Sequence, residues 1–162
     1  EWSWRLEWVT CLAVAPDGDR AVTWSRAYLG DDAKGPDWLE VWDLAGRRHV
    51  GRVGVPRSPA PVAVLSPDGK TLVTWGEGRG RAGSLRSWDP VTGRSEGSEV
   101  PYDGLGGMVH GPGRDPHVVF VAPRARNELI ALDYRTGQQV RTVALGRADA
   151  LTRPVFSPDG TR

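Results

Sequence analysis

A turn of the form Pro-Asp-Gly follows a short apolar run at regular intervals along the chain. Pro16 and Pro67 are 51 residues apart, and Pro67 and Pro158 are 91 apart, which is close to two units of 45. Pro sets φ at the second position of a turn, and Asp-Gly accepts the conformations that follow. The turns occur at Ala15–Gly18, Ser66–Gly69 and Ser157–Gly160, and in degraded form at Gly111–Arg114. A repeat of this length constrains the fold more than any other feature of the sequence.

A second mark repeats in phase with these turns. Asp43, Asp89 and Asp133 are separated by 46 and then 44 residues, and Trp42 and Trp88 precede the first two of them. A period in the forties made of short strands predicts the blades of a β-propeller. We therefore expect an all-β chain, a propeller segment of four-stranded antiparallel blades, with about three complete blades and a stray strand at each end.

Alternation and β-branched or aromatic enrichment predict four strands in each unit. In the first unit they span Val9–Ala15, Arg20–Ser25, Trp38–Asp43 and Arg47–Val55. In the second they span Pro61–Ser66, Thr71–Trp75, Ser84–Asp89 and Arg94–Val100. In the third they span Leu105–His110, His117–Ala122, Glu128–Asp133 and Gln138–Leu145.

The repeats divide the chain into five segments. The first unit is longer than the others because the polar stretch 26–37 predicts a long loop. The segments are 1–8, an outer strand of a preceding blade; 9–55, blade repeat 1; 56–102, blade repeat 2; 103–146, blade repeat 3; and 147–162, the start of a truncated blade repeat 4.

Composition excludes several classes of protein. The chain is 39% apolar and 25% charged with a net charge of +1, which argues against nucleic acid or an anionic membrane as a partner. No stretch has the length of a transmembrane span, and no signal peptide is visible, so we expect a cytoplasmic protein. The single cysteine, Cys11, allows no internal disulfide.

Candidate catalytic groups do not converge in the repeat pattern. His49, His110 and His117 lack the spacing of metal ligands, and the chain contains no nucleophile elbow or phosphate-binding loop. The repeat aspartates lie one blade apart, so they point in equivalent directions and do not share a centre. We expect no catalytic, cofactor-binding or metal-binding residues, and hence no enzyme activity.

The full repeat pattern resembles the WD-repeat (WD40) β-propellers. The clearest matches are Leu85–Asp89 followed by Thr92–Gly93, and Leu39–Asp43. The resemblance covers nearly the whole chain, although no Gly-His pair opens any unit and the third unit has Leu132-Asp133-Tyr134, which leaves room for another propeller family. The residues that mark the repeat, for which we expect structural roles, are Asp17, Gly18, Trp42, Asp43, Asp68, Gly69, Trp88, Asp89 and Asp133.

The resemblance implies a non-catalytic scaffold that presents loops to a protein or peptide partner, without a cofactor. It also implies that the loops between the second and third strands share one face and that the first strand of a repeat often completes the preceding blade. The candidate partner-binding residues in these loops are Asp31, Asp32, Arg79, Arg81, Arg124 and Arg126. The alternative is that these are ordinary solvated loops.

Other functions stay open at this stage. The segment is alternatively an accessory or substrate-binding domain of a larger enzyme, such as a bacterial signalling kinase or hydrolase fusion, or a binder of small ligands at the channel mouth. Three blades leave two apolar blade faces in water, so we also expect either the remaining blades of a longer chain or copies of this one as partners.

Overall fold

The computed structural model describes residues 9–15, 17–25, 36–56, 61–77, 83–110, 115–124 and 126–146. The strands predicted within 1–8 and 147–162 and the loop predicted at 26–37, apart from its last two residues, lie outside this part of the chain. Among the described residues all regular structure is β. The strands are β1 (Val9–Val14), β2 (Arg20–Ser25), β3 (Asp37–Asp43), β4 (Arg48–Val55), β5 (Val62–Leu65), β6 (Leu72–Glu77), β7 (Gly83–Trp88), β8 (Ser95–Pro101), β9 (Leu105–His110), β10 (Val118–Pro123), β11 (Glu128–Asp133) and β12 (Gln139–Ala144).

These strands form three antiparallel sheets of four, and each sheet consists of strands that are consecutive in the chain. The sheets are β1-β2-β3-β4, β5-β6-β7-β8 and β9-β10-β11-β12, which we call blades 1, 2 and 3. The expected all-β class with four-stranded blades is confirmed. The first strand of each unit pairs with the second strand of the same unit and lies in the same sheet as the other three, so these sheets are not offset by one strand from the sequence repeat.

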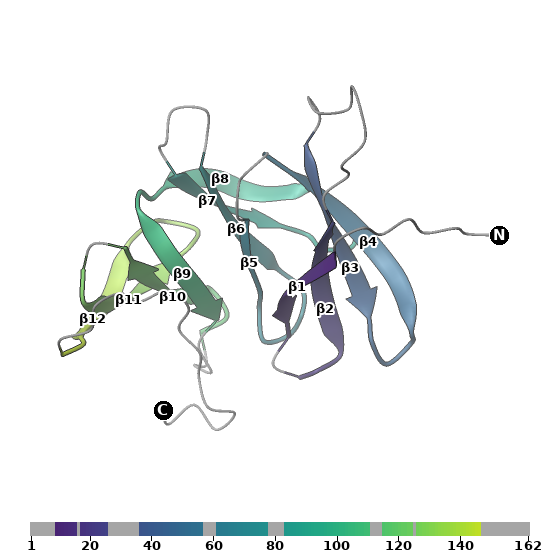
Figure 1. Cartoon of the computed structure of the whole chain (residues 1–162), viewed down its shortest axis with the longest axis horizontal. Helices are drawn as coiled ribbons and strands as arrows, with labels where there is room; N and C mark the ends of the chain where they lie inside the picture. Colours follow the sequence, from purple (N-terminus) through teal and green to yellow (C-terminus); the bar gives the residue numbers. More distant parts are fainter. Residues whose placement is uncertain are drawn as a thin grey trace.

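The blades follow one another around their first strands (Figure 1). Strand β5 contacts both β1 and β9, whereas the last strands of the blades lie at the rim. Three of the four residues of β5 are buried, as expected for an innermost strand that is covered on both faces. This arrangement is a segment of a β-propeller.

Two apolar clusters hold the blades together, and the alternation of blade 2 supplies both of them. Leu65, Leu72 and Trp88 pack against blade 1, where the cluster includes Val41. Val64 and Val73, their neighbours in sequence, point to the opposite face of the sheet, where they pack against blade 3 together with Leu85. Burying each large apolar side chain contributes about 1.5–3 kcal/mol. Both faces of blade 2 are therefore interfaces.

Carboxylates at the strand ends organise the turns. Asp89 accepts hydrogen bonds from the N–H groups of Val91 (2.8 Å) and Thr92 (3.0 Å). Asp43 and Asp133 play the same part in the corresponding turns, where they accept from the backbone of Gly46 and Arg135. All three carboxylates thus tie a turn to the end of the third strand of its blade.

The Pro-Asp-Gly turns likewise combine an aspartate acceptor with a glycine at positive φ. Gly18 and Gly69 have φ of 78° and 63°, a region that favours glycine. In blade 2 the hydroxyl of Ser66 donates to Asp68 (2.6 Å) and accepts from the N–H of Thr71 (2.9 Å). Asp17 accepts from the N–H of Asp19 in the equivalent turn of blade 1.

The repeat tryptophans make the same hydrogen bond in two environments. Trp88 Nε1 donates to Thr74 Oγ1 and Trp42 Nε1 donates to Thr23 Oγ1, both at 2.8 Å. Trp88 is buried between blades 1 and 2. Trp42 lies on the face of blade 1 that is turned away from blade 2, and its ring meets His49 edge-on within the same blade.

Blades 1 and 2 also touch at their backbones. A Cβ added to Gly93, which has φ of 69°, would lie 2.4 Å from the carbonyl oxygen of Arg52, and one added to Gly51 would lie 2.5 Å from that of Pro90. Glycine is required at these positions because the turn between β7 and β8 rests directly on β4.

This close approach gives a matched test. Gly93→Ala and Gly97→Ala both force alanine into the left-handed region (φ 69° and 77°), but a Cβ at Gly97 would have only Ser87 Oγ nearby, at 4.0 Å. We expect Gly93→Ala to lower the free energy of unfolding by about 1–3 kcal/mol more than Gly97→Ala, since only the first must displace a neighbouring backbone. Denaturant unfolding curves measure the difference, and equal losses would contradict the contact between the blades.

The turn carboxylates predict acid sensitivity. Hydrogen bonds from the backbone of Thr92 and Val91 lower the pKa of Asp89. The pKa of Asp43 is lowered by the backbone N–H of Gly46 and then by the side chain of Arg48. The side chain of Arg135 lowers the pKa of Asp133. A lowered pKa in the folded state stabilises the fold above the ordinary value of 3.8, and this contribution is lost as the pH falls through the folded-state pKa.

We therefore expect the free energy of unfolding to be flat around pH 6 and to decrease below about pH 4.5, since carboxylates begin to protonate there. The triple variant Asp43→Asn, Asp89→Asn, Asp133→Asn is expected to show a shallower decrease of the free energy of unfolding in this pH range. Unfolding curves recorded at a series of pH values test this. Identical slopes for the two proteins would show that other groups control the acid response.

Candidate functional site

One end of the sheets collects the long loops and the connections between blades. Successive connections in an antiparallel meander alternate between the two ends, so the loops β2–β3, β6–β7 and β10–β11 lie at the same end as the linkers β4–β5 and β8–β9. We call this end the loop face. The short turns with the repeat aspartates lie at the opposite end, which separates the structural marks from the candidate binding residues.

Of the predicted loop residues, the structure describes two. Arg124 and Arg126 are exposed in the β10–β11 loop, and Arg126 Nη1 donates to Glu128 Oε1 at 3.1 Å. The remaining candidates, Asp31, Asp32, Arg79 and Arg81, lie outside the described residues. The structure therefore places one basic loop of the predicted surface.

The linker between blades 2 and 3 holds the described ends of two neighbouring connections of this face. Tyr102 N–H donates to the carbonyl of Gly83 (2.8 Å), and Gly83 N–H donates to Asp103 Oδ1 (2.7 Å). Arg124 N–H donates to the carbonyl of Gly104 at 2.7 Å. The end of the β6–β7 loop and the start of the β10–β11 loop are thus held to one short segment.

Sequence reasoning did not identify Tyr102 and Asp103. Burial raises the pKa of Tyr102, while the charge of Arg126 lowers it and that of Glu128 raises it, so the phenol stays protonated near neutral pH. The carbonyl of Tyr102 accepts a hydrogen bond from Trp75 Nε1 at 2.8 Å. The sequence feature that could have indicated these two residues is their polarity directly after Pro101, the last residue of β8.

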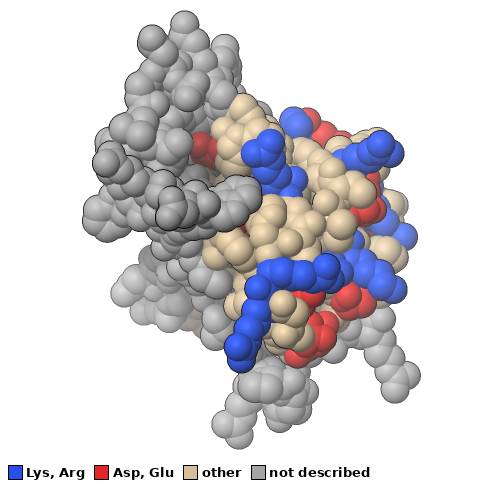
Figure 2. Space-filling view, turned by 90° about the vertical axis from the view of Figure 1, so that its right-hand side faces the viewer, with Lys and Arg blue, Asp and Glu red and all other residues tan. Residues whose placement is uncertain are grey.

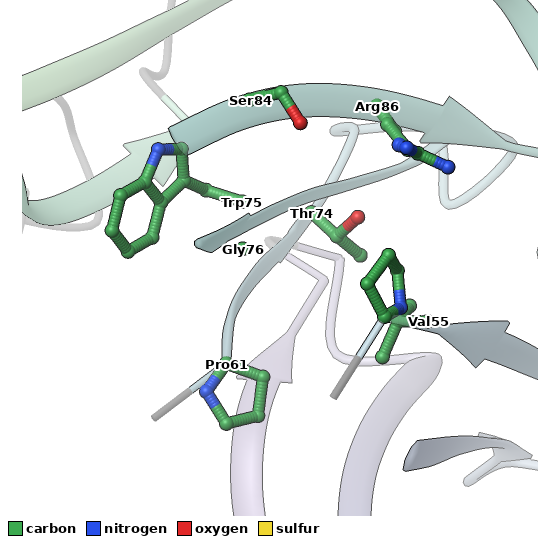
Figure 3. A pocket seen from close by; sticks show the side chains of 8 residues that line it. Val55, Pro61, Thr74, Trp75, Gly76, Ser84 and Arg86 are labelled. Carbon is green, nitrogen blue, oxygen red and sulfur yellow. The ribbon is translucent and has the colours of Figure 1, made fainter. Parts of the chain in front are cut away.

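A shallow hollow, open to solvent and with room for about one water molecule, lies between blades 1 and 2 beside the loop face. Thr74 lies on β6, Ser84 and Arg86 lie on β7, and Val55 and Pro61 flank the linker from blade 1 (Figure 3). Blade 1 contributes apolar surface, whereas blade 2 contributes the polar side chains of Thr74, Ser84 and Arg86 together with Trp75 and Gly76.

Arg86 is the charged group of this hollow. Its Nη2 donates to Glu99 of the neighbouring strand β8, an exposed pair at the rim. Its Nε is buried and has no hydrogen-bond partner within the described part of the chain. A buried N–H without an acceptor costs about 1–3 kcal/mol.

Histidines lie elsewhere in the blades. His49 Nε2 contacts Glu40 Oε2 across β3 and β4, a carboxylate partner that the sequence spacing did not show. His117 Nδ1 lies 3.2 Å from Tyr134 Oη. Among the residues that the structure describes, no group of three His, Cys, Asp or Glu side chains could hold a metal ion.

The far face of blade 1 carries mixed charge. Trp38 is 38% exposed there, and the guanidinium of Arg52 lies 4.4 Å from its ring centroid. Figure 2 looks onto the molecule from the side of blade 1 and shows basic and acidic side chains interspersed on the described surface. No helix in the described residues is long and apolar enough to cross a membrane.

Comparisons with known proteins support the fold. No protein-family model and no curated protein matches the chain. Among solved structures the chain is similar to hydrazine synthase from Kuenenia stuttgartiensis, with a TM-score of 0.58 and 19% sequence identity. The match covers 91% of this chain but only 38% of the hydrazine synthase chain. At this identity the similarity shows the fold alone, and membership of the WD-repeat family stays a prediction.

Proposed function

We propose that this propeller segment is a non-catalytic interaction module that binds a protein or peptide through its loop face. The observation that carries the proposal is the linker 102–104, which holds Gly83 at the start of β7 and Arg124 after β10 by hydrogen bonds. Backbone that is already held in place loses little entropy on binding, and this favours recognition of a partner.

The charges on this face favour an acidic partner. Arg124 and Arg126 are exposed, and Arg126 pairs with Glu128 at the surface. Such pairs are worth about 0–1 kcal/mol, so a carboxylate on a partner can replace this contact at small cost. Arginine offers planar, forked donors suited to carboxylates.

The alternative is an accessory domain of a larger enzyme. Its support is that the similar hydrazine synthase chain is an enzyme chain of which this segment matches 38%. Since fold does not determine function, this similarity favours no particular substrate or reaction.

Site-specific crosslinking tests which face binds. A photo-crosslinking residue at the exposed Asn127 of the loop face is expected to capture one defined protein in cells of the source organism. The same residue at the exposed Thr92, in a turn at the opposite end, is expected not to capture it. Capture of the same proteins from both positions, or of none from Asn127, would contradict the proposal.

Charge removal tests the basic loop. Arg124→Ser with Arg126→Ser is expected to reduce capture at Asn127 severalfold while leaving the unfolding midpoint unchanged, because exposed loop charges contribute little to stability. The matched control, Lys70→Ser with Arg94→Ser, removes two charges from the opposite end. Equal capture by both double variants would show that the basic loop makes no contact with the partner.

A further inference from the structure

The outermost strands of the three blades, β4, β8 and β12, can be compared position by position. Within the described residues each of them pairs on one side only, and an unpaired edge offers backbone donors and acceptors to another strand. In each blade the leucine four residues before the repeat aspartate pairs with a valine of the outermost strand, namely Val53, Val100 and Val143. The residues that follow these valines, Gly54, Pro101 and Ala144, are therefore equivalent.

Hydrogen bonding at the end of β12 shows which of its backbone groups are open. The N–H of Leu145 donates to the carbonyl of Asn127 at 2.8 Å. In an antiparallel pair, successive residues direct their backbone groups alternately toward the partner strand and away from it. The groups of Leu145 and Val143 therefore face β11, and those of Ala144 and Thr142 face away from it. Both of these outward-facing residues are exposed.

The corresponding edge of β8 is protected. Because the N–H of Tyr102 donates to the carbonyl of Gly83, the outward-facing residues of β8 are Pro101 and Glu99. Proline has no N–H to donate, and a charged side chain on an edge opposes further pairing. Gly97, with φ of 77°, adds an irregularity to the same strand. This edge is thus unsuited to a further strand.

The edge of β4 is partly covered by blade 2. The carbonyl oxygen of Arg52 lies where a Cβ on Gly93 would approach it to 2.4 Å, so the turn between β7 and β8 closes this position. Strand β12, by contrast, contains neither glycine nor proline, and its register shift lies near Gln139, away from Ala144. Among the described outermost strands, β12 therefore has the most open edge; it lies at the outside of blade 3 (Figure 1).

We propose that β12 binds an extended segment of the partner as a fifth strand of blade 3. This inference rests on the proposed function, since the hydrogen bond between Leu145 and Asn127 joins the end of β12 to the loop face. The outward-facing groups of Thr142 and Ala144 pair with the backbone of the segment. Main-chain hydrogen bonds provide the affinity in this mode of recognition, and side chains provide the specificity.

The charges around this edge select an acidic segment. Strand β12 carries one cation, Arg141, and no acidic residue. A segment that pairs with Ala144 reaches the loop that carries the exposed Arg124 and Arg126, where a carboxylate finds planar, forked donors. The β12 strand of a second copy would bring only another Arg141 to this edge. Charge complementarity therefore favours an acidic peptide segment over a second copy of the chain.

A synthetic peptide tests the edge directly. The probe is acetyl-Glu-Thr-Val-Thr-Val-Thr-amide, and the matched probe has lysine in place of glutamate. In ¹⁵N NMR titrations, the backbone amide resonances of Thr142 and Ala144 are expected to shift and saturate, whereas that of Glu99 in β8 stays unchanged. The lysine peptide is expected to bind severalfold more weakly. A response that does not saturate, or an equal response at Glu99, would overturn the proposed strand site. Equal affinity of both peptides would overturn the preference for an acidic segment.

A proline variant removes one donor of the edge. Ala144→Pro reproduces in β12 what Pro101 provides in β8, and it is expected to leave the unfolding midpoint unchanged because the N–H of Ala144 faces away from β11. The response of Thr142 to the glutamate peptide should disappear. Ala144→Ser keeps the N–H and should keep the response. Thr142→Pro, read at Ala144, replaces the first variant if that one does not fold. Unchanged peptide binding in a folded proline variant would contradict the pairing.

Crosslinking at Asn127 separates this inference from the proposed function. Ala144→Pro is expected to lower capture of the partner severalfold relative to Ala144→Ser. Saturable peptide binding with equal capture by both variants would overturn the use of β12 by the partner while the interaction module stands. Absence of capture by the parent chain would overturn the proposed function and, with it, this use of the edge. A dimer in light scattering that Ala144→Pro converts to a monomer would assign the edge to a second copy and overturn the inference.

Discussion

The structure depends on the burial of both faces of blade 2. Because side chains alternate along a strand, Leu72 and Val73 are neighbours in sequence yet pack against different blades. Neither cluster exists within a single sheet, so each blade derives its stability from the blade beside it. The backbone contact of Gly93 with Arg52 adds a steric limit to this packing. Together they leave few ways to arrange three successive blades.

Hydrogen bonds at the two ends of the blades have different roles. At one end Asp43, Asp89 and Asp133 accept donors within their own turns, which makes each turn a local unit. At the other end Asp103 accepts a hydrogen bond from the N–H of Gly83, so the linker is held to the start of β7 while it leads into the next blade. The first pattern repeats in all three blades and is structural. The second involves residues that follow no repeat.

The two crevices between the blades differ where the repeat is broken. Where blade 3 places Ile130 in an interface, blade 2 places Arg86, and Val55 stands where the other crevice has Tyr102. A shallow, solvent-open hollow lies at the crevice that has the smaller side chain and the charged one. In a chain of near-equivalent blades, such local departures distinguish one crevice from the next.

The sequence alone determined the strands and their division into sheets, because turn residues such as Gly69 and the alternation around Val73 are local signals. Strand ends agree within about two residues for this reason. The repeat also indicated the turn roles of the aspartates. Only the tertiary structure decided which crevice is hollow. It also decided that Asp103 accepts a hydrogen bond from Gly83 and that Glu40 contacts His49. These contacts join residues whose separation in sequence follows no pattern. Packing between blades is non-local, and a periodic sequence shows the period but not its exceptions in space.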